Sequence, residues 1–140
     1  MNSANLPAIP LVCIAIAYLL VYVPHFIAGR ARFKMQGGFD NHHPRDQAAR
    51  LEGWAKRASA AHLNGHESFS PFAIAVVVAL IGCAGHANEH TVTLLAVTYV
   101  VLRIAYIVVY LADLAAVRSL VWTAGLGITF ALFLLPLFSC

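Results

Sequence analysis

The chain has 140 residues, of which 61% are hydrophobic and only 11% are charged, and its formal net charge is +3. A soluble domain carries roughly 25% charged and 45–50% apolar residues, and a small body buries a lower fraction of its surface than a large one. The excess of apolar residues therefore excludes an ordinary soluble domain, a disordered chain and a nucleic-acid-binding module. We expect an integral membrane protein with no nucleic-acid partner.

Four apolar stretches predict membrane-spanning helices, at about 6–28, 60–85, 91–112 and 119–139. Each approaches the ~20 residues that a helix needs to cross ~30 Å of hydrocarbon. The runs are continuous rather than alternating, which argues against a closed β-barrel. The sequence predicts one all-α domain over 1–140, an integral membrane four-helix bundle.

The basic residues are distributed unevenly between the predicted connections. Seven of the nine Lys and Arg residues lie between the first and second spans, namely Arg30, Arg32, Lys34, Arg45, Arg50, Lys56 and Arg57. Under the positive-inside rule, this long first connection and the third one face the cytoplasm and both termini lie outside. No basic residue precedes the first apolar run, so we expect no cleaved signal peptide.

A polar stripe on the second span contains Arg57, Asn64, Glu67 and Pro71, at steps of seven, three and four residues. These steps place all four on one helix face. Polar residues at membrane depth are costly and indicate function by default, so Asn64 and Glu67 are candidate ligand-binding residues. The alternative is a polar helix base at the lipid headgroups.

A second stripe contains Arg103, Tyr106, Tyr110 and Asp113 on one face of the third span. Arg103 lies deep in its span and needs an anionic partner, for which we expect Glu67. That pair could equally be structural, and the tyrosines could belong to an interfacial aromatic belt.

Four residues at the cytoplasmic level favour an anionic ligand. Arg118 and Ser119 open the last span, and Arg30 and Arg32 end the first. A helix N-terminus favours anions, and a neighbouring cation raises the thiolate fraction of a thiol. The set suits a small ligand with carboxylates and a thiol, although the three arginines could simply mark topology.

The remaining His, Glu and Cys side chains are predicted to have neither a metal-binding nor a redox role. His86, Glu89 and His90 have a spacing that could hold a metal, but they lie in a short turn, and we expect no metal site. The three cysteines form no CxxC pair and are interpreted as packing thiols.

Two segments resemble the MAPEG family (membrane-associated proteins in eicosanoid and glutathione metabolism). The run 57–72 carries the family's arginine, its Asn-x-x-Glu pair and its Pro-Phe pair, and Arg103, Tyr110 and Arg118-Ser119 are similar to its third and fourth helices. The resemblance covers nearly the whole chain. It implies a homotrimer that binds glutathione between neighbouring subunits at the cytoplasmic side, and a lipophilic second substrate that enters from the lipid between helices one and four.

The resemblance also implies roles for individual residues. Arg118 would stabilise the glutathione thiolate, with Ser119 beside it, and Arg30 or Arg32 would meet a glutathione carboxylate. The other implied contacts are Asn64, Glu67, Arg103, Tyr106 and Tyr110.

The chain also departs from the family's prostaglandin E synthases, which carry further arginines where it has Ala60 and Leu63 and a histidine where it has Tyr106. It is closer to the short bacterial branch, which implies a bacterial inner membrane. The expected function is a membrane-bound, glutathione-dependent transferase or peroxidase acting on lipophilic electrophiles. The alternatives are a non-catalytic lipid-binding or scaffold member and an accessory subunit of a membrane complex.

Overall fold

The computed structural model describes residues 8–83 and 89–138, and within these ranges it contains helices and no strand. The four long helices are α1 (Ala8–Phe33), α3 (Gly53–Gly82), α4 (Glu89–Leu111) and α5 (Ala115–Phe138), and each is long and apolar enough to cross a membrane. The short helix α2 (Pro44–Ala49) lies between α1 and α3. The expected all-α class is confirmed for the described residues, as is the expectation of four helices able to cross a membrane.

The helices extend beyond the apolar runs at their polar ends. α1 continues to Phe33, α3 begins at Gly53 and α5 begins at Ala115. Hydropathy marks where the hydrocarbon ends, whereas the backbone hydrogen bonds of a helix continue into the polar flanks. Gly53 adopts a positive φ of 54°, a conformation that glycine takes at little cost, and it separates α2 from α3. The expected bounds at residues 6, 85 and 139 lie outside the described residues.

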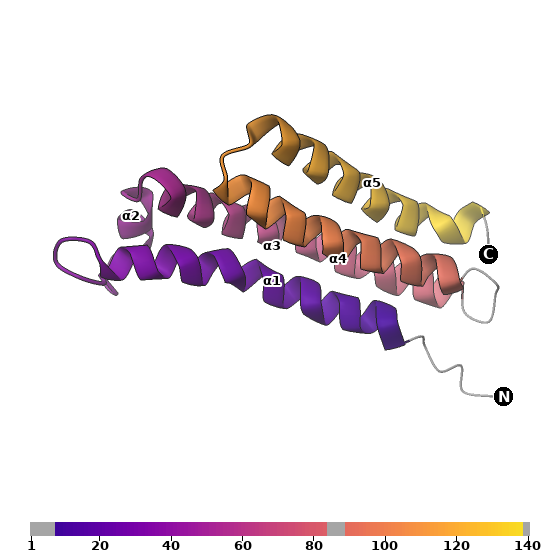
Figure 1. Cartoon of the computed structure of the whole chain (residues 1–140). Coiled ribbons are helices and arrows are strands. Elements are labelled where there is room, and N and C mark those ends of the chain that lie inside the picture. The colour runs from indigo at the N-terminus through magenta and orange to yellow at the C-terminus, as the bar shows by residue number, and fades with distance from the viewer. Residues whose placement is uncertain (1–7, 84–88, 139–140) are drawn as a thin grey trace.

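The long helices run side by side, as Figure 1 shows. The α1–α2 connection and the α4–α5 turn lie at one end of the bundle, and the described ends of the chain, Ala8 and Phe138, lie at the other. This arrangement agrees with the expectation that the first and third connections share one side of the membrane.

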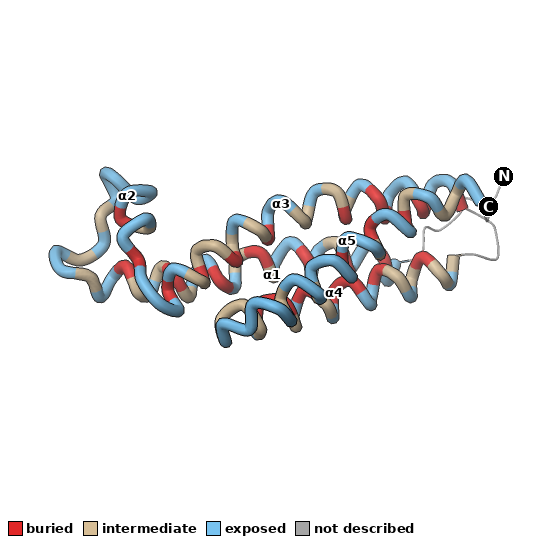
Figure 2. Tube along the Cα trace, turned by 90° about the horizontal axis from the view of Figure 1, so that it is seen from above, coloured by how far each residue is buried: buried red, intermediate tan, exposed pale blue. Residues whose placement is uncertain are grey.

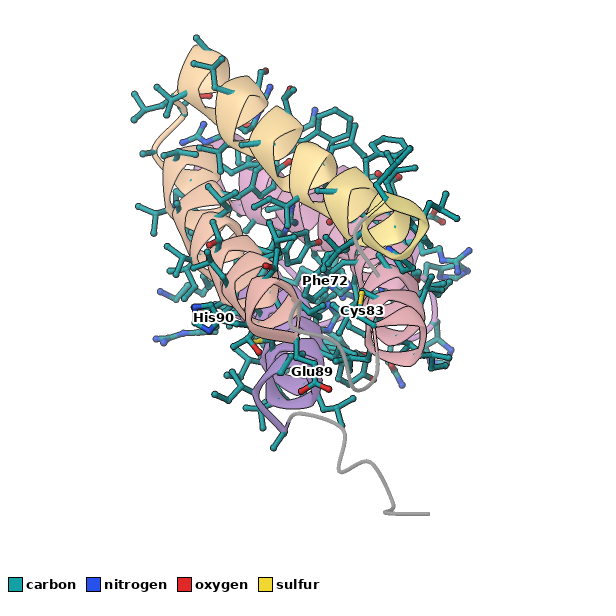
Figure 3. The ribbon with its side chains drawn as sticks, turned by 90° about the vertical axis from the view of Figure 1, so that its right-hand side faces the viewer. Phe72, Cys83, Glu89 and His90 are labelled. Atoms are coloured by element: carbon teal, nitrogen blue, oxygen red, sulfur yellow. The ribbon has the colours of Figure 1, made fainter. Side chains whose placement is uncertain are left out.

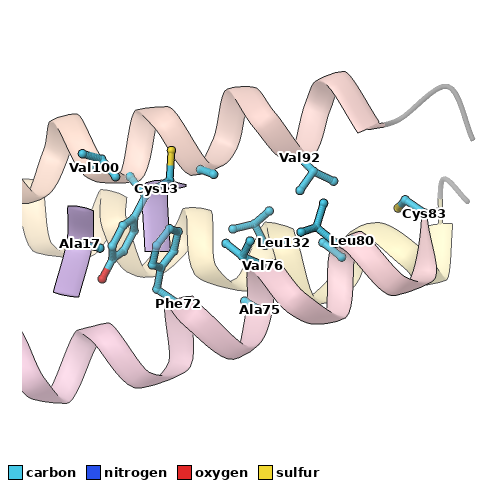
Figure 4. Packing of buried hydrophobic residues seen from close by; sticks show 13 residues of the cluster. Cys13, Ala17, Phe72, Ala75, Val76, Leu80, Cys83, Val92, Val100 and Leu132 are labelled. Carbon is cyan, nitrogen blue, oxygen red and sulfur yellow. The ribbon is translucent and has the colours of Figure 1, made fainter. Parts of the chain in front are cut away.

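Small and apolar side chains fill the centre of the bundle. Phe72, Val76 and Leu80 of α3 pack toward Val92 of α4 and Leu132 of α5, and none of the five is more than 2% exposed (Figure 4). Seen along the bundle, Phe72 lies between the helices (Figure 3). The outward faces carry exposed residues along every long helix (Figure 2), and many of these are large and apolar. Such faces suit contact with lipid rather than water.

A close approach joins α3 and α5 at the end of the bundle opposite the α4–α5 turn. A Cβ added to Gly82 would lie 2.5 Å from the Cβ of Pro136, so α3 and α5 approach here as only glycine permits. Cys83 is disulfide-bonded, which corrects its interpretation as a packing thiol. Cys13 is free and buried.

Candidate functional site

The polar stripes of α3 and α4 face each other in antiparallel register. Both Nη1 and Nη2 of Arg103 donate to Oδ1 of Asn64, at 3.5 and 3.4 Å. The Tyr99 hydroxyl, one turn earlier on α4, donates to the Ser68 carbonyl at 2.9 Å. The described residues hold no Glu67–Arg103 ion pair, which corrects the expected pairing. This register sets Arg103 level with Asn64, and it leaves Glu67 exposed.

The first residue of the α3 stripe fixes the turn into α5. Arg57 Nη1 lies 3.3 Å from Asp113 Oδ2, and its Nε donates to the Leu111 carbonyl at 3.3 Å. A cation is favoured at the C-terminal end of a helix such as α4, where carbonyls lack partners. This contact holds the turn from which α5 and Arg118 begin.

Arg103 is a buried cation with few partners. It is 8% exposed, its guanidinium lies 4.4 Å from the centre of the Tyr106 ring, and Asn64 is its hydrogen-bond acceptor. No ion pair within 4 Å neutralises it in the part of the chain that the structure describes. A buried charge without a counter-charge is expensive. The site therefore favours an anion close to Arg103.

A pocket of about 550 Å³ opens between α3, α4 and α5. Its volume lies in the range of roughly 300–1,000 Å³ that is typical of small-molecule sites. Six of the residues singled out in the sequence line it: Asn64, Glu67, Tyr106, Tyr110, Arg118 and Ser119. The structure thus brings them together from three helices within one chain.

Two residues at the start of α5 are placed differently in this pocket. The Arg118 guanidinium lies 4.5 Å from the centre of the Tyr110 ring, and the ring of Tyr106 meets that of Tyr110 edge-on at 5.4 Å. The hydroxyl of Ser119 donates to the Ala115 carbonyl at 3.1 Å. Arg118 therefore presents a charge to the pocket, whereas the proton of Ser119 is already used within its helix.

A smaller pocket of about 100 Å³ adjoins the larger one. Asn64, Glu67 and Trp122 line both, and Arg103 lines the smaller one. We call the larger one the thiol pocket, after the ligand that the sequence resemblance implies, and the smaller one the apolar pocket.

The two arginines at the end of α1 line neither of these pockets. Arg32 Nε donates to Gln47 Oε1 at 3.0 Å, its Nη2 donates to the Asp40 carbonyl at 3.3 Å, and its guanidinium lies 4.3 Å from the centre of the Phe39 ring. Arg30 is exposed in the last turn of α1. Within one chain, therefore, Arg32 closes the loop after α1 and Arg30 is free to meet another molecule.

The sequence did not single out Trp122 as a site residue, although it lines both pockets. Its spacing could have indicated this place, because Trp122 follows Arg118 by four residues and the two therefore lie on one face of α5. As for metals, the described residues contain no group of three or more His, Cys, Asp or Glu side chains placed to hold an ion. His86 lies outside the described residues.

Four helices long and apolar enough to cross a membrane, with a pocket between three of them that Arg118 lines, define a helical integral membrane protein. A model of the MAPEG family matches residues 9–138, nearly the entire chain. The chain therefore belongs to the MAPEG family. No curated protein and no solved structure matches it.

Proposed function

We propose that the protein is a glutathione-dependent transferase or peroxidase that acts on lipophilic electrophiles in the membrane. The observation that carries the proposal is the convergence of six polar residues from α3, α4 and α5 on the thiol pocket. Family membership supports it, because the family includes glutathione transferases.

The charges around the thiol pocket suit glutathione, which has two carboxylates and a thiol. Arg103 lacks an ion-pair partner among the described residues, and Arg118 is half-buried against Tyr110. A cation beside a thiol lowers its pKa and increases the thiolate fraction at neutral pH. Arg118 rather than Ser119 carries this role in the proposal, because the serine proton bonds within α5.

The chemistry needs only the thiolate and a substrate from the bilayer. In transfer, the thiolate sulfur attacks an electrophilic carbon and a C–S bond forms. In a substitution, the leaving group departs with its electron pair. In an addition, the π pair of the electrophile moves to its electron-withdrawing group, which is then protonated. With a hydroperoxide, the sulfur takes the terminal oxygen, an alcohol leaves after protonation, and a second glutathione reduces the sulfenic acid to give a disulfide and water. The protein contributes orientation and electrostatic stabilisation.

The proposed assembly is a homotrimer in which α1 of one subunit meets the thiol pocket of the next. Arg30 suits this role better than Arg32, because Arg32 already has three partners in its own chain. Native mass spectrometry of the purified protein would then give a mass of three chains.

One observation favours a second candidate, a lipid-binding or scaffold member without turnover. Ala60 and Leu63 line the thiol pocket and give it an apolar wall. Such a wall suits the acyl chain of a lipid as well as it suits a peptide-like thiol.

The test is the rate of glutathione conjugation to a chromogenic electrophile by the purified protein. Wild type should exceed the solution rate, and Arg118→Ala should lose about 10²-fold, as expected when one stabilising donor is removed. Arg45→Ala is the matched control, because Arg45 is exposed in α2 and lines neither pocket. A folded wild type at the solution rate, with or without bound lipid, would overturn the proposal.

A further inference from the structure

The apolar pocket has one polar end and otherwise apolar walls. Pro71, Tyr99, Trp122 and Leu126 supply rings and aliphatic carbon to these walls. Arg103, Asn64 and Glu67 form the polar part of the lining, and Asn64 and Glu67 also line the thiol pocket. A ligand here would place an apolar group against the walls and a reactive end toward the thiol.

The hydroxyls around this pocket are committed within the protein. Thr129 Oγ1 donates to the Gly125 carbonyl at 3.0 Å, and Ser68 Oγ donates to the Asn64 carbonyl at 2.7 Å. The Tyr99 hydroxyl donates to the Ser68 carbonyl at 2.9 Å. Because these protons are used, the walls offer a ligand mainly apolar contact.

The size of the pocket limits the group that enters it. A dry cavity of about 150 Å³ accepts benzene, so a pocket of about 100 Å³ admits at most one aromatic ring or a short branched chain. Trp122 and Leu126, which line the pocket, are themselves 40% and 36% exposed, so the pocket is not sealed by the rest of the chain.

We propose that the apolar pocket binds the apolar group of the electrophile and selects electrophiles that carry a single ring. The absence of a side chain at Gly125 sets this size limit. The inference rests on the proposed function for its reactive partner, glutathione. A Cβ on Gly125 would lie 3.8 Å from Tyr99 Cε2, an ordinary contact, so alanine fits there and occupies space in the pocket.

Gly127 provides a matched control for Gly125. Two residues along a helix turn the side chain by about 200°, and a Cβ on Gly127 meets nothing within 4 Å. Gly125→Ala and Gly127→Ala are therefore the same substitution on the same helix, and only the first narrows the pocket.

The experiment compares three nitroalkenes that carry a methyl, a phenyl or a naphthyl group. In each, the thiolate sulfur bonds to the alkene carbon, the π pair moves to the nitro group, and water protonates the resulting nitronate, so the alkene absorbance is lost. Gly125→Ala should lower kcat/KM for the phenyl compound about tenfold, the least expected for a methyl-sized change in a pocket, and leave the methyl compound unchanged. Gly127→Ala should leave all three unchanged.

A variant that widens the pocket tests the same idea with an expected gain of activity, which loss of folding could not produce. Thr129→Ser keeps the hydroxyl that bonds Gly125 and removes a methyl group from the wall, so it should raise turnover of the naphthyl compound. Equal phenyl rates in Gly125→Ala and Gly127→Ala, with glutathione bound in both by isothermal titration calorimetry, would overturn the inference but not the proposed function.

A binding measurement keeps the test independent of catalysis. Trp54 is exposed on α3, so Trp54→Phe leaves Trp122, the other tryptophan, as the fluorescent reporter of the pocket. Nitrobenzene should quench it at lower concentration in Gly127→Ala than in Gly125→Ala. Absence of glutathione binding in every variant would defeat the proposed function alone, and equal quenching in both variants would defeat the pocket.

Discussion

Arg32 and Arg103 are both 8% exposed, yet their surroundings differ. Arg32 has a side-chain acceptor, a backbone acceptor and an aromatic ring around its guanidinium. Arg103 has one amide oxygen, which two of its nitrogens share, and one aromatic ring. An arginine carries five N–H donors, and each of these two uses two of its nitrogens, but Arg103 shares a single acceptor at 3.4–3.5 Å whereas Arg32 has two acceptors at 3.0 and 3.3 Å. The exposed fraction therefore does not distinguish the two arginines, whereas the number of their hydrogen-bond acceptors does.

The surroundings of Arg32 and Arg103 differ because the first lies against a folded loop and the second lies between long helices. The connection between α1 and α2 folds back so that Gln47 accepts from both Arg32 and the Asp40 amide. The helices α3, α4 and α5 instead surround hollows that their own side chains leave open. The first region is closed by its own hydrogen bonds, and the second leaves space that the proposed glutathione would fill.

The largest expected effect is on ligand affinity in Arg103→Met, which keeps the side-chain volume but removes the charge. Loss of one partner of a buried charge pair costs about 2 kcal/mol or more, roughly 30-fold in affinity. The thermal unfolding midpoint should not fall, because an incompletely neutralised buried charge is removed. Calorimetric titration with glutathione and thermal unfolding in detergent measure the two effects. Unchanged affinity would place the anion elsewhere.

The second effect is on stability in Arg32→Met. Removing the hydrogen bonds of a charged group costs about 1.5–3 kcal/mol, so the unfolding midpoint should fall while the folded variant binds glutathione as wild type does. Arg45→Met, in the exposed part of α2, is the control and should match wild type. Reduced affinity with an unchanged midpoint would instead mean that Arg32 enters the thiol pocket of a neighbouring subunit.

The smallest effect concerns Asp40 in the α1–α2 connection. Its carboxylate accepts from the backbone N–H groups of His43, at 2.9 Å, and His42, at 2.8 Å, and these bonds, led by that of His43, hold the pKa of Asp40 below its usual range. The stabilisation is therefore present at neutral pH and is lost only as the pH falls through this lowered pKa.

Hydrogen exchange of the amides of His42 and His43 measures this contribution. Exchange at neutral pH should be faster in Asp40→Ala than in wild type, while peptides from α4 around Arg103 remain unchanged. Equal exchange in the two proteins would show that the carboxylate does not order the loop.

The sequence predicts the helices and most of the site because both follow helical periodicity. Asn64 and Glu67 share one face of α3, and Tyr106 and Tyr110 share one face of α4, so each pair arrives at the thiol pocket together. The partner of Arg103 could not be predicted, because it depends on the register between two helices that packing of Phe72 against Tyr99 helps to set. Nor could the contacts of Arg32, which depend on how an irregular loop closes.

The ultraviolet difference spectrum of the purified protein on addition of glutathione, beside that of Arg118→Ala, examines whether the thiol pocket ionises a bound thiol. A thiolate band at neutral pH in wild type, lost in the variant, is the expected result. Absence of the band at saturating glutathione in folded wild-type protein, or a band that persists in Arg118→Ala, would contradict the proposed role of Arg118.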